Sequence, residues 1–175
     1  MNSIDFALPS GYSGFPIKLK AQWQLARHLL NITTGNGYNR TIKEVYIERE
    51  DFENAPDRTA VNAWWQGDRV LNANRNDATI GVYSVESIVM LDFILDSTDP
   101  NTERGFTQAD VEKYFLAKAN RNDCLPEDGG AGTIQSMMVA AVIPWGNAQT
   151  EPRCGMNMEL KVWYKTKMGD PYTRP

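Results

Sequence analysis

The chain has 175 residues, of which 42% are hydrophobic and 23% are charged, and its formal net charge is −4. This length predicts one domain, residues 1–175, with a substantial hydrophobic core. The acidic balance gives no electrostatic basis for gripping a nucleic-acid backbone, and no apolar run reaches the roughly 20 residues that a membrane-spanning helix needs.

The first 15 residues contain prolines and glycines among scattered aromatic residues, and this composition predicts an extended N-terminal arm. Pro16 suits the first position of a helix. Residues 18–31 then carry apolar side chains at helical spacing, which predicts an amphipathic helix. Its apolar stripe comprises Leu19, Trp23, Ala26 and Leu30, widened by Leu25 and Leu29.

Two strands are predicted next. Residues 42–49 alternate, with Val45 and Ile47 on one side, which indicates a half-exposed strand. Residues 60–66 form a second predicted strand, in which Trp64 and Trp65 are adjacent and therefore point to opposite faces. One ring in the core and one on a partly covered surface is the ordinary interpretation. A contact with a partner is the alternative, because tryptophan is enriched at interfaces.

The strongest pattern in the chain is a long apolar strand over residues 88–96. Its odd positions, Val89, Leu91, Phe93 and Leu95, are all apolar, whereas its even positions are mixed: Ile88, Met90, Asp92, Ile94 and Asp96. Such a strand either lies centrally in its sheet or buries its second face against another element or another chain. The extended pattern begins near residue 79, which makes it longer than the usual five or six residues. This length leaves open a β-hairpin arm that projects beyond the domain.

A helix is predicted over residues 107–120, with Thr107 as its N-cap, after a turn at residues 96–101. Residues 134–143 are apolar throughout their centre and indicate another buried strand. Residues 156–165 alternate strictly between apolar and polar, which predicts a strand with one buried face, and residues 167–175 form a C-terminal tail. This order predicts an α+β fold, a mostly antiparallel sheet with two helices packed on one face.

Residues that could hold a metal ion or act as a nucleophile are sparse. His28 is the single histidine, and Cys124 and Cys154 lack the spacing of paired metal ligands. We therefore expect no metal, no cofactor and no enzymatic activity. In a reducing cytosol the two cysteines are expected to stay as thiols.

One motif favours a different function. Glu159-Leu160-Lys161 matches the Glu-x-Lys element of the PD-(D/E)xK nucleases, in which a carboxylate holds Mg²⁺ and a lysine assists attack on the phosphodiester. The acidic residue upstream would be Asp96 or Asp128. Glu and Lys are also ordinary residues on the solvent side of a strand, so a Mg-dependent nuclease is an alternative hypothesis.

From residue 86 onward, the order of elements resembles the tail-terminator proteins of long-tailed bacteriophages. In that family an N-terminal helix precedes a sheet, a long apolar strand leads into a helix, and two strands close the sheet. The corresponding segments here are residues 18–31, 88–96, 107–120, 133–143 and 156–166. The segment 51–85 is an expansion relative to that family, which leaves a related neck or tail-completion protein open.

The resemblance implies a virion structural protein without catalytic residues. Its copies would form a ring, commonly sixfold, that caps the tail tube, stops its polymerisation and joins it to the head connector. The implied partners are further copies of the chain, the tail tube protein and a connector or neck protein, with DNA passing through the lumen without specific binding and no membrane involved. A capsid decoration or other accessory binding protein is the alternative.

Synthesis is expected in the host cytoplasm, because residues 1–6 have neither the basic region nor the long apolar core of a signal peptide. The final location would be the tail or neck of the virion. The residues expected at oligomer or partner contacts are Trp64, Trp65, Ile88, Met90, Asp92, Ile94 and Trp163.

Overall fold

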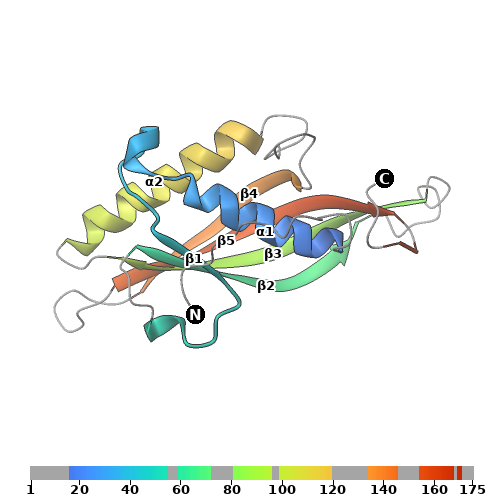
Figure 1. The fold of residues 1–175 in the computed structure, drawn as a ribbon, viewed down its shortest axis with the longest axis horizontal. Helices are drawn as coiled ribbons and strands as arrows, with labels where there is room; N and C mark the ends of the chain where they lie inside the picture. Colours follow the sequence, from blue (N-terminus) through green and yellow to red (C-terminus); the bar gives the residue numbers. More distant parts are fainter. Residues whose placement is uncertain are drawn as a thin grey trace.

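A computed structural model describes residues 16–54, 59–71, 81–95, 99–119, 134–145, 154–167 and 169–170. These residues form two α-helices, two short 3₁₀ helices and five strands (Figure 1). In chain order the elements are α1 (Ile17–Leu30), η2 (Thr34–Asn36), β1 (Glu44–Ile47), η3 (Phe52–Asn54), β2 (Ala60–Val70), β3 (Val82–Leu95), α2 (Pro100–Ala119), β4 (Ile134–Trp145) and β5 (Cys154–Lys167).

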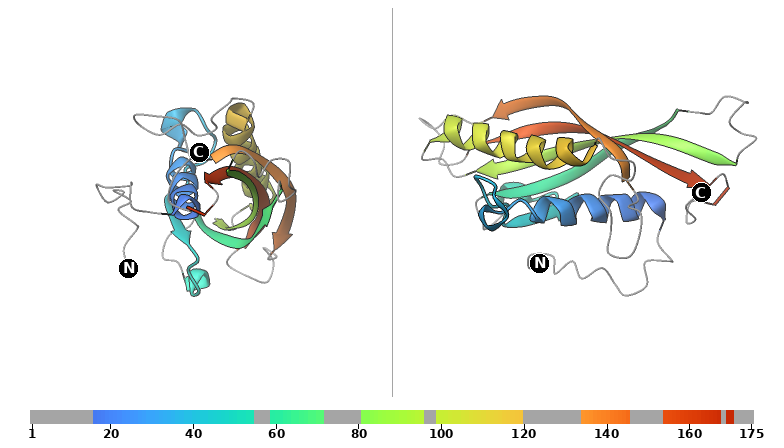
Figure 2. Two further views of the ribbon diagram at one scale, coloured as in Figure 1. Left: turned by 90° about the vertical axis from the view of Figure 1, so that its right-hand side faces the viewer. Right: turned by 90° about the horizontal axis from the view of Figure 1, so that it is seen from above.

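The five strands belong to one sheet in the order β1-β2-β3-β5-β4. Three of the four pairings are antiparallel, and β1 runs parallel to β2. The predicted α+β fold with a mostly antiparallel sheet is therefore confirmed, and the long strand β3 is central, as its apolar pattern indicated. Figure 2 shows that the strands are strongly twisted and that both helices lie on the same side of them.

The core lies between the sheet and the two helices. Every second residue of β3 points into it, including Val89, Leu91 and Phe93, and all three are fully buried. The same alternation on β5 buries Met156, Met158, Leu160 and Val162. The helices contribute Leu25 and Leu29 from α1 and Val111 and Phe115 from α2. The period-two patterns of the sequence thus identify the covered face of the sheet.

The buried stripe of α1 overlaps the predicted one in part, since Leu25, Ala26 and Leu29 are buried as predicted. Ile17, Ala21, Leu25 and Leu29, spaced four residues apart, face the core, whereas Leu19, Trp23 and Leu30 are only half-buried. Pro16 precedes the helix instead of opening it, because its ψ of 145° is extended and its carbonyl accepts the first helical hydrogen bond from Lys20.

The second helix begins seven residues earlier than predicted. Asp99 precedes it, Pro100 is its first residue, and the Glu103 amide donates to the Asp99 carbonyl at 2.9 Å. An acidic residue followed by proline is a helix start of its own, which the turn-like composition of residues 96–101 concealed. Thr107 is therefore not a cap but a buried residue in the interior of the helix.

Two predicted strands also differ in their surroundings. β1 is shorter than predicted, and both of its faces are buried, because Phe52 of η3 packs against Tyr46 on the side away from the helices. β4 is the outermost strand at the opposite side of the sheet, so it is not the fully buried strand that its apolar run indicated.

Several predictions fall outside the described residues. These are the N-terminal arm (residues 1–15), the tip of the predicted hairpin (residues 72–80), Asp96, Cys124, Asp128 and most of the C-terminal tail. Within the described part, β3 and β5 continue past the start of α1, where Val82 pairs with Lys167 (Figure 1).

Candidate interaction surface

The face of the sheet opposite the two helices is the candidate site, and we call it the open face. Its rows follow from the strand register. Trp64, Met90 and Glu159 form one row, and Ile88, Lys161 and Met138 form the next. Glu86, Trp163 and Ser136 form a third row. Of the described helices, only the short η3 lies on this side, at one end (Figure 1).

Apolar side chains dominate the centre of the open face. Trp64, Ile88 and Met90 are half-buried, and Met138 and Ile143 on β4 are 44% and 59% exposed. Trp64, Ile88 and Met90 lie on neighbouring strands, and β5, with Glu159 and Lys161 on this face, separates them from Met138 and Ile143. Large apolar side chains left partly in water are typical of a site that another molecule covers. The open face therefore has the composition of an interface.

Asp92 lies on the open face beside the apolar residues. Burial raises the pKa of its carboxyl group, and a hydrogen bond from Trp64 partly opposes that rise. Its Oδ1 atom is buried and has no hydrogen-bond partner among the described residues. Since an unpaired buried polar atom is costly, this carboxylate favours a donor from another molecule or a proton of its own.

Trp163, in the third row of the open face, makes a specific contact with the neighbouring strand. Its Nε1 donates a hydrogen bond of 3.1 Å to the Glu86 carboxylate on the neighbouring strand β3. The pair fixes the indole on the open face, where a rigid aromatic side chain loses little entropy on contact with a partner.

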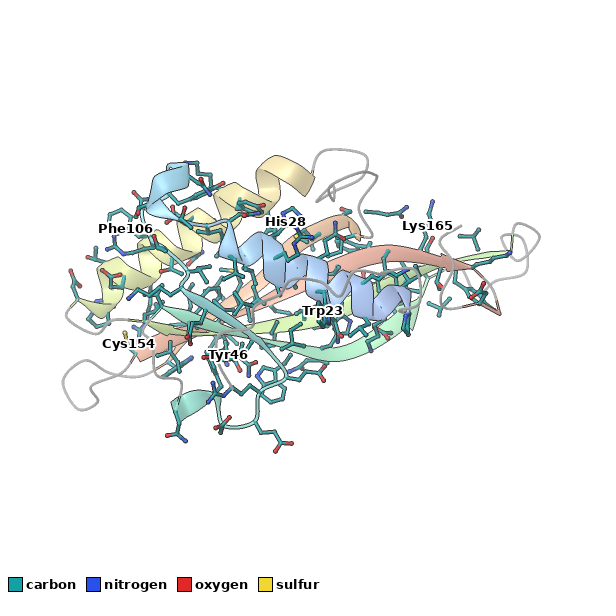
Figure 3. All side chains as sticks on the ribbon, in the orientation of Figure 1. Trp23, His28, Tyr46, Phe106, Cys154 and Lys165 are labelled. Atoms are coloured by element: carbon teal, nitrogen blue, oxygen red, sulfur yellow. The ribbon has the colours of Figure 1, made fainter. Side chains whose placement is uncertain are left out.

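One end of the open face is closed by the chain itself. Tyr46, Phe52, Ala60 and Ile94 form a small buried cluster there, with Trp145 packed against it. Tyr46 donates a hydrogen bond to the Glu44 carboxylate, and burial together with this bond raises its pKa to about 12. Figure 3 shows Tyr46 on the opposite side of the sheet from His28.

The structure thus separates the seven residues predicted as contacts. Trp64, Ile88, Met90, Asp92 and Trp163 share the open face. Ile94 faces the same way but is 2% exposed beneath the closed end. Trp65 lies on the helix-covered face, packed against the core, and its Nε1 has no partner among the described residues. The two tryptophans do point to opposite faces, as predicted.

Met138 and Ile143 were missed by the sequence analysis. Their strand looked buried, because a run of apolar residues does not show whether a strand is central or at an edge. The signal that it is an edge strand was Pro144 within it, because proline in a sheet is confined to edges and bulges.

The ends of β4 are fastened to the helices. Gln24 of α1 accepts a hydrogen bond from the Ile134 amide at 2.9 Å. Arg104 of α2 donates to the carbonyl of Trp145 and, at 2.9 Å, to that of Gly155. Between these two points, no described strand lies beyond the outer side of β4.

Glu159 and Lys161, the described residues of the nuclease hypothesis, lie on the open face. Glu159 is paired with Met90 and Lys161 with Ile88, so both charges have apolar neighbours. In the described part of the chain, no three acidic, histidine or cysteine residues are grouped so that they could hold a metal ion.

The single histidine has a local role in packing. His28 Nδ1 lies 2.5 Å from the Tyr114 hydroxyl, which also accepts a hydrogen bond from Asn31 at 3.3 Å. Figure 3 shows His28 on the side of α1 nearer to α2. These bonds connect the end of α1 to α2.

In the described ranges, neither helix has the length and apolar character needed to cross a membrane. Comparison with known proteins gave no match, either to a family model or to a curated protein sequence.

Proposed function

We propose that this chain is a structural subunit that assembles with copies of itself into a ring at the end of a phage tail tube. In this role it would stop polymerisation of the tube and join it to the head connector. The observation that carries the proposal is the open face, a sheet surface with Trp64, Met90 and Ile88 at its centre and uncovered Ile143 at its margin.

The distribution of burial supports an assembly role over a catalytic one. Both helices pack on one face of the sheet, and their side chains form the hydrophobic core with it. The other face keeps large apolar side chains partly in water and includes a carboxylate oxygen that has no partner among the described residues. A second protein surface would remove the apolar side chains from water, at roughly 25 cal/mol per Å² of apolar area.

The ring would have two further partners and a defined place in the virion. The tail tube protein and a connector or neck protein would contact the two rims of the ring, and the protein would be made in the host cytoplasm and become part of the virion. A net charge of −4 suits a lumen through which DNA passes without binding.

The experiment is to measure the mass of the purified protein by light scattering across a concentration range, alone and with isolated tail tubes. A ring-sized oligomer, or a monomer that forms rings only on tube ends, is expected. Ile143→Asp should weaken this assembly, while the matched control Ala109→Asp, on an exposed position of α2, should leave it unchanged.

Other outcomes would replace the proposal. A trimer that coats capsids and ignores tube ends would favour a decoration protein. Metal-dependent cleavage of DNA that Glu159→Ala abolishes would favour the nuclease. A protein that is strictly monomeric and indifferent to tail tubes would exclude the ring.

A further inference from the structure

Among the described strands, the sheet has an unpaired edge on each side. On one side, β4 is outermost along its whole length. On the other side, β1 pairs only with residues 60–63 of β2, although β2 continues to Val70. The last backbone bond on that side joins the Glu48 amide to the Ala63 carbonyl at 3.0 Å. Residues 64–70 of β2 therefore have no described strand on the side away from β3, and we call them the free half of β2.

Neither described edge carries a row of charged side chains that would prevent pairing, while Pro144 and two bulges interrupt β4 and one bulge interrupts β2. Natural edge strands commonly carry lysine or other charges that prevent another strand from adding. β4 contains no charged residue, and its Met138 and Ile143 are exposed. The free half of β2 contains Asp68 and Arg69, but Asp68 is bound to Lys18 of α1 at 2.9 Å, on the helix side. Val70 at its end is 42% exposed.

We propose that β4 of one subunit pairs with the free half of β2 of the next, so that one sheet continues through the assembly. The inference rests on the proposed function, because it specifies the contact by which copies would join. The two edges lie on opposite sides of the same sheet, so a subunit that uses one edge still presents the other. Contacts of this head-to-tail kind generate closed rings when the rotation between subunits closes.

The strand directions agree with this pairing. Across the sheet, β3 is antiparallel to β2, β5 is antiparallel to β3, and β4 is antiparallel to β5. The strand β4 therefore runs opposite to β2. Rotation about a ring axis along the strands leaves their direction unchanged. The β2 strand of the next subunit therefore meets β4 in antiparallel orientation, and the alternation of the sheet continues across the contact.

A bulge in β2 and a bulge in β4 offer positions at which each edge can be blocked by substitution. Gln66 of β2 and Ala140 of β4 are exposed and have no partner in the strand register, because each lies in an irregularity of its strand. A proline at a bulge leaves the internal ladder intact, while it hinders an incoming strand. Ala140→Pro blocks the β4 edge, and Gln66→Pro blocks the edge of β2.

The experiment compares the wild type, each variant and a 1:1 mixture of the variants by sedimentation velocity, at a concentration at which the wild type assembles. Each variant alone should be monomeric, since it lacks one of the two complementary edges. The mixture should give a dimer and no ring, because the intact β2 edge of Ala140→Pro pairs with the intact β4 of Gln66→Pro.

The results distinguish a failure of the proposed function from a failure of the edge pairing. If the wild type stays monomeric with and without tail tubes, the proposed function fails and the inference with it. If the wild type assembles but the variants also form rings, only the inference is overturned. If Gln66→Pro forms dimers alone, β4 pairs with itself instead. Should a proline prevent folding, as judged by circular dichroism, Gln66→Lys and Ala140→Lys replace the pair, with Ala109→Lys as control.

Discussion

On β3, neighbouring residues meet two different environments. Leu91 is fully buried beneath the helices, whereas Met90, one residue earlier, is half-buried on the open face. Both are large and apolar, so the difference comes from what covers them and not from their own chemistry. The helices of this chain cover the first face, and we propose that another chain covers the open face. Substitutions on the first should change stability, and substitutions on the second should change assembly.

The largest effect is expected at Gly155, where the chain itself closes the end of the open face. A Cβ atom at this position would overlap the carbonyl oxygen of Phe93 and the ring of Trp145. Since the obstacle includes backbone, Gly155→Ala should lower the free energy of unfolding by about 4 kcal/mol or prevent folding, as large steric changes do. Urea denaturation followed by circular dichroism measures the change.

Gly105 provides the matched control. It lies in α2, and a Cβ there would meet nothing within 4 Å. Gly105→Ala should raise the free energy of unfolding by about 0.5–1 kcal/mol, because alanine has the higher helix propensity. Equal effects at the two glycines would contradict the close contact around Gly155.

The next prediction tests the two faces directly on β3. Leu91→Ala should cost about 2–5 kcal/mol of unfolding free energy, as for other buried leucines. Met90→Ala, on the open face, should cost less than half as much in the monomer, because its side chain is already partly in water. Assembly should show the reverse order, with Met90→Ala the more damaging. Equal losses of stability would mean that the two faces are covered alike.

Much of this contrast could be predicted from the sequence. The alternation in β3 and β5 identified the face that the helices cover, and the adjacency of Trp64 and Trp65 placed them on opposite faces, because strand geometry is local. The order of the strands across the sheet, in contrast, depends on contacts between residues far apart in the sequence. The exposure of Ile143 depends on β4 lying at the edge, and the burial of Tyr46 depends on η3 folding back over β1. Apart from Pro144, which marks β4 as an edge strand, no pattern within either strand indicates these neighbours.

The tryptophan pair should separate stability from assembly. Trp65 packs against the core, so Trp65→Ala should lower the unfolding free energy by about 2–3 kcal/mol, below the range for fully buried aromatic residues because it is only partly buried. Trp64→Ala should lower the monomer's stability less and weaken assembly more. Thermal unfolding and light scattering measure the two effects. If neither variant changes assembly, the open face is not a contact surface.

The smallest effect is expected from Asp92 and depends on pH. Burial raises the pKa of this carboxyl, so the folded protein keeps the proton to higher pH than the unfolded chain does. The resulting stabilisation is complete below the unfolded pKa, near 3.9, and is lost as pH rises through the folded pKa. At neutral pH the buried charge is therefore a cost, and Asp92→Asn should be slightly more stable than the wild type.

The gain from Asp92→Asn should disappear at about pH 3, where the wild-type carboxyl is protonated in both states. Asp51 is the control of opposite sign, because Arg49, at 2.7 Å, lowers its pKa. Its contribution is present above the unfolded pKa and is lost as pH falls, so Asp51→Asn should bring no gain at neutral pH. Assembly adds a further distinction. If the ring supplies a donor to Asp92, Asp92→Asn stabilises the monomer at pH 7 but weakens the oligomer, whereas a carboxyl that stays uncovered would leave assembly unchanged.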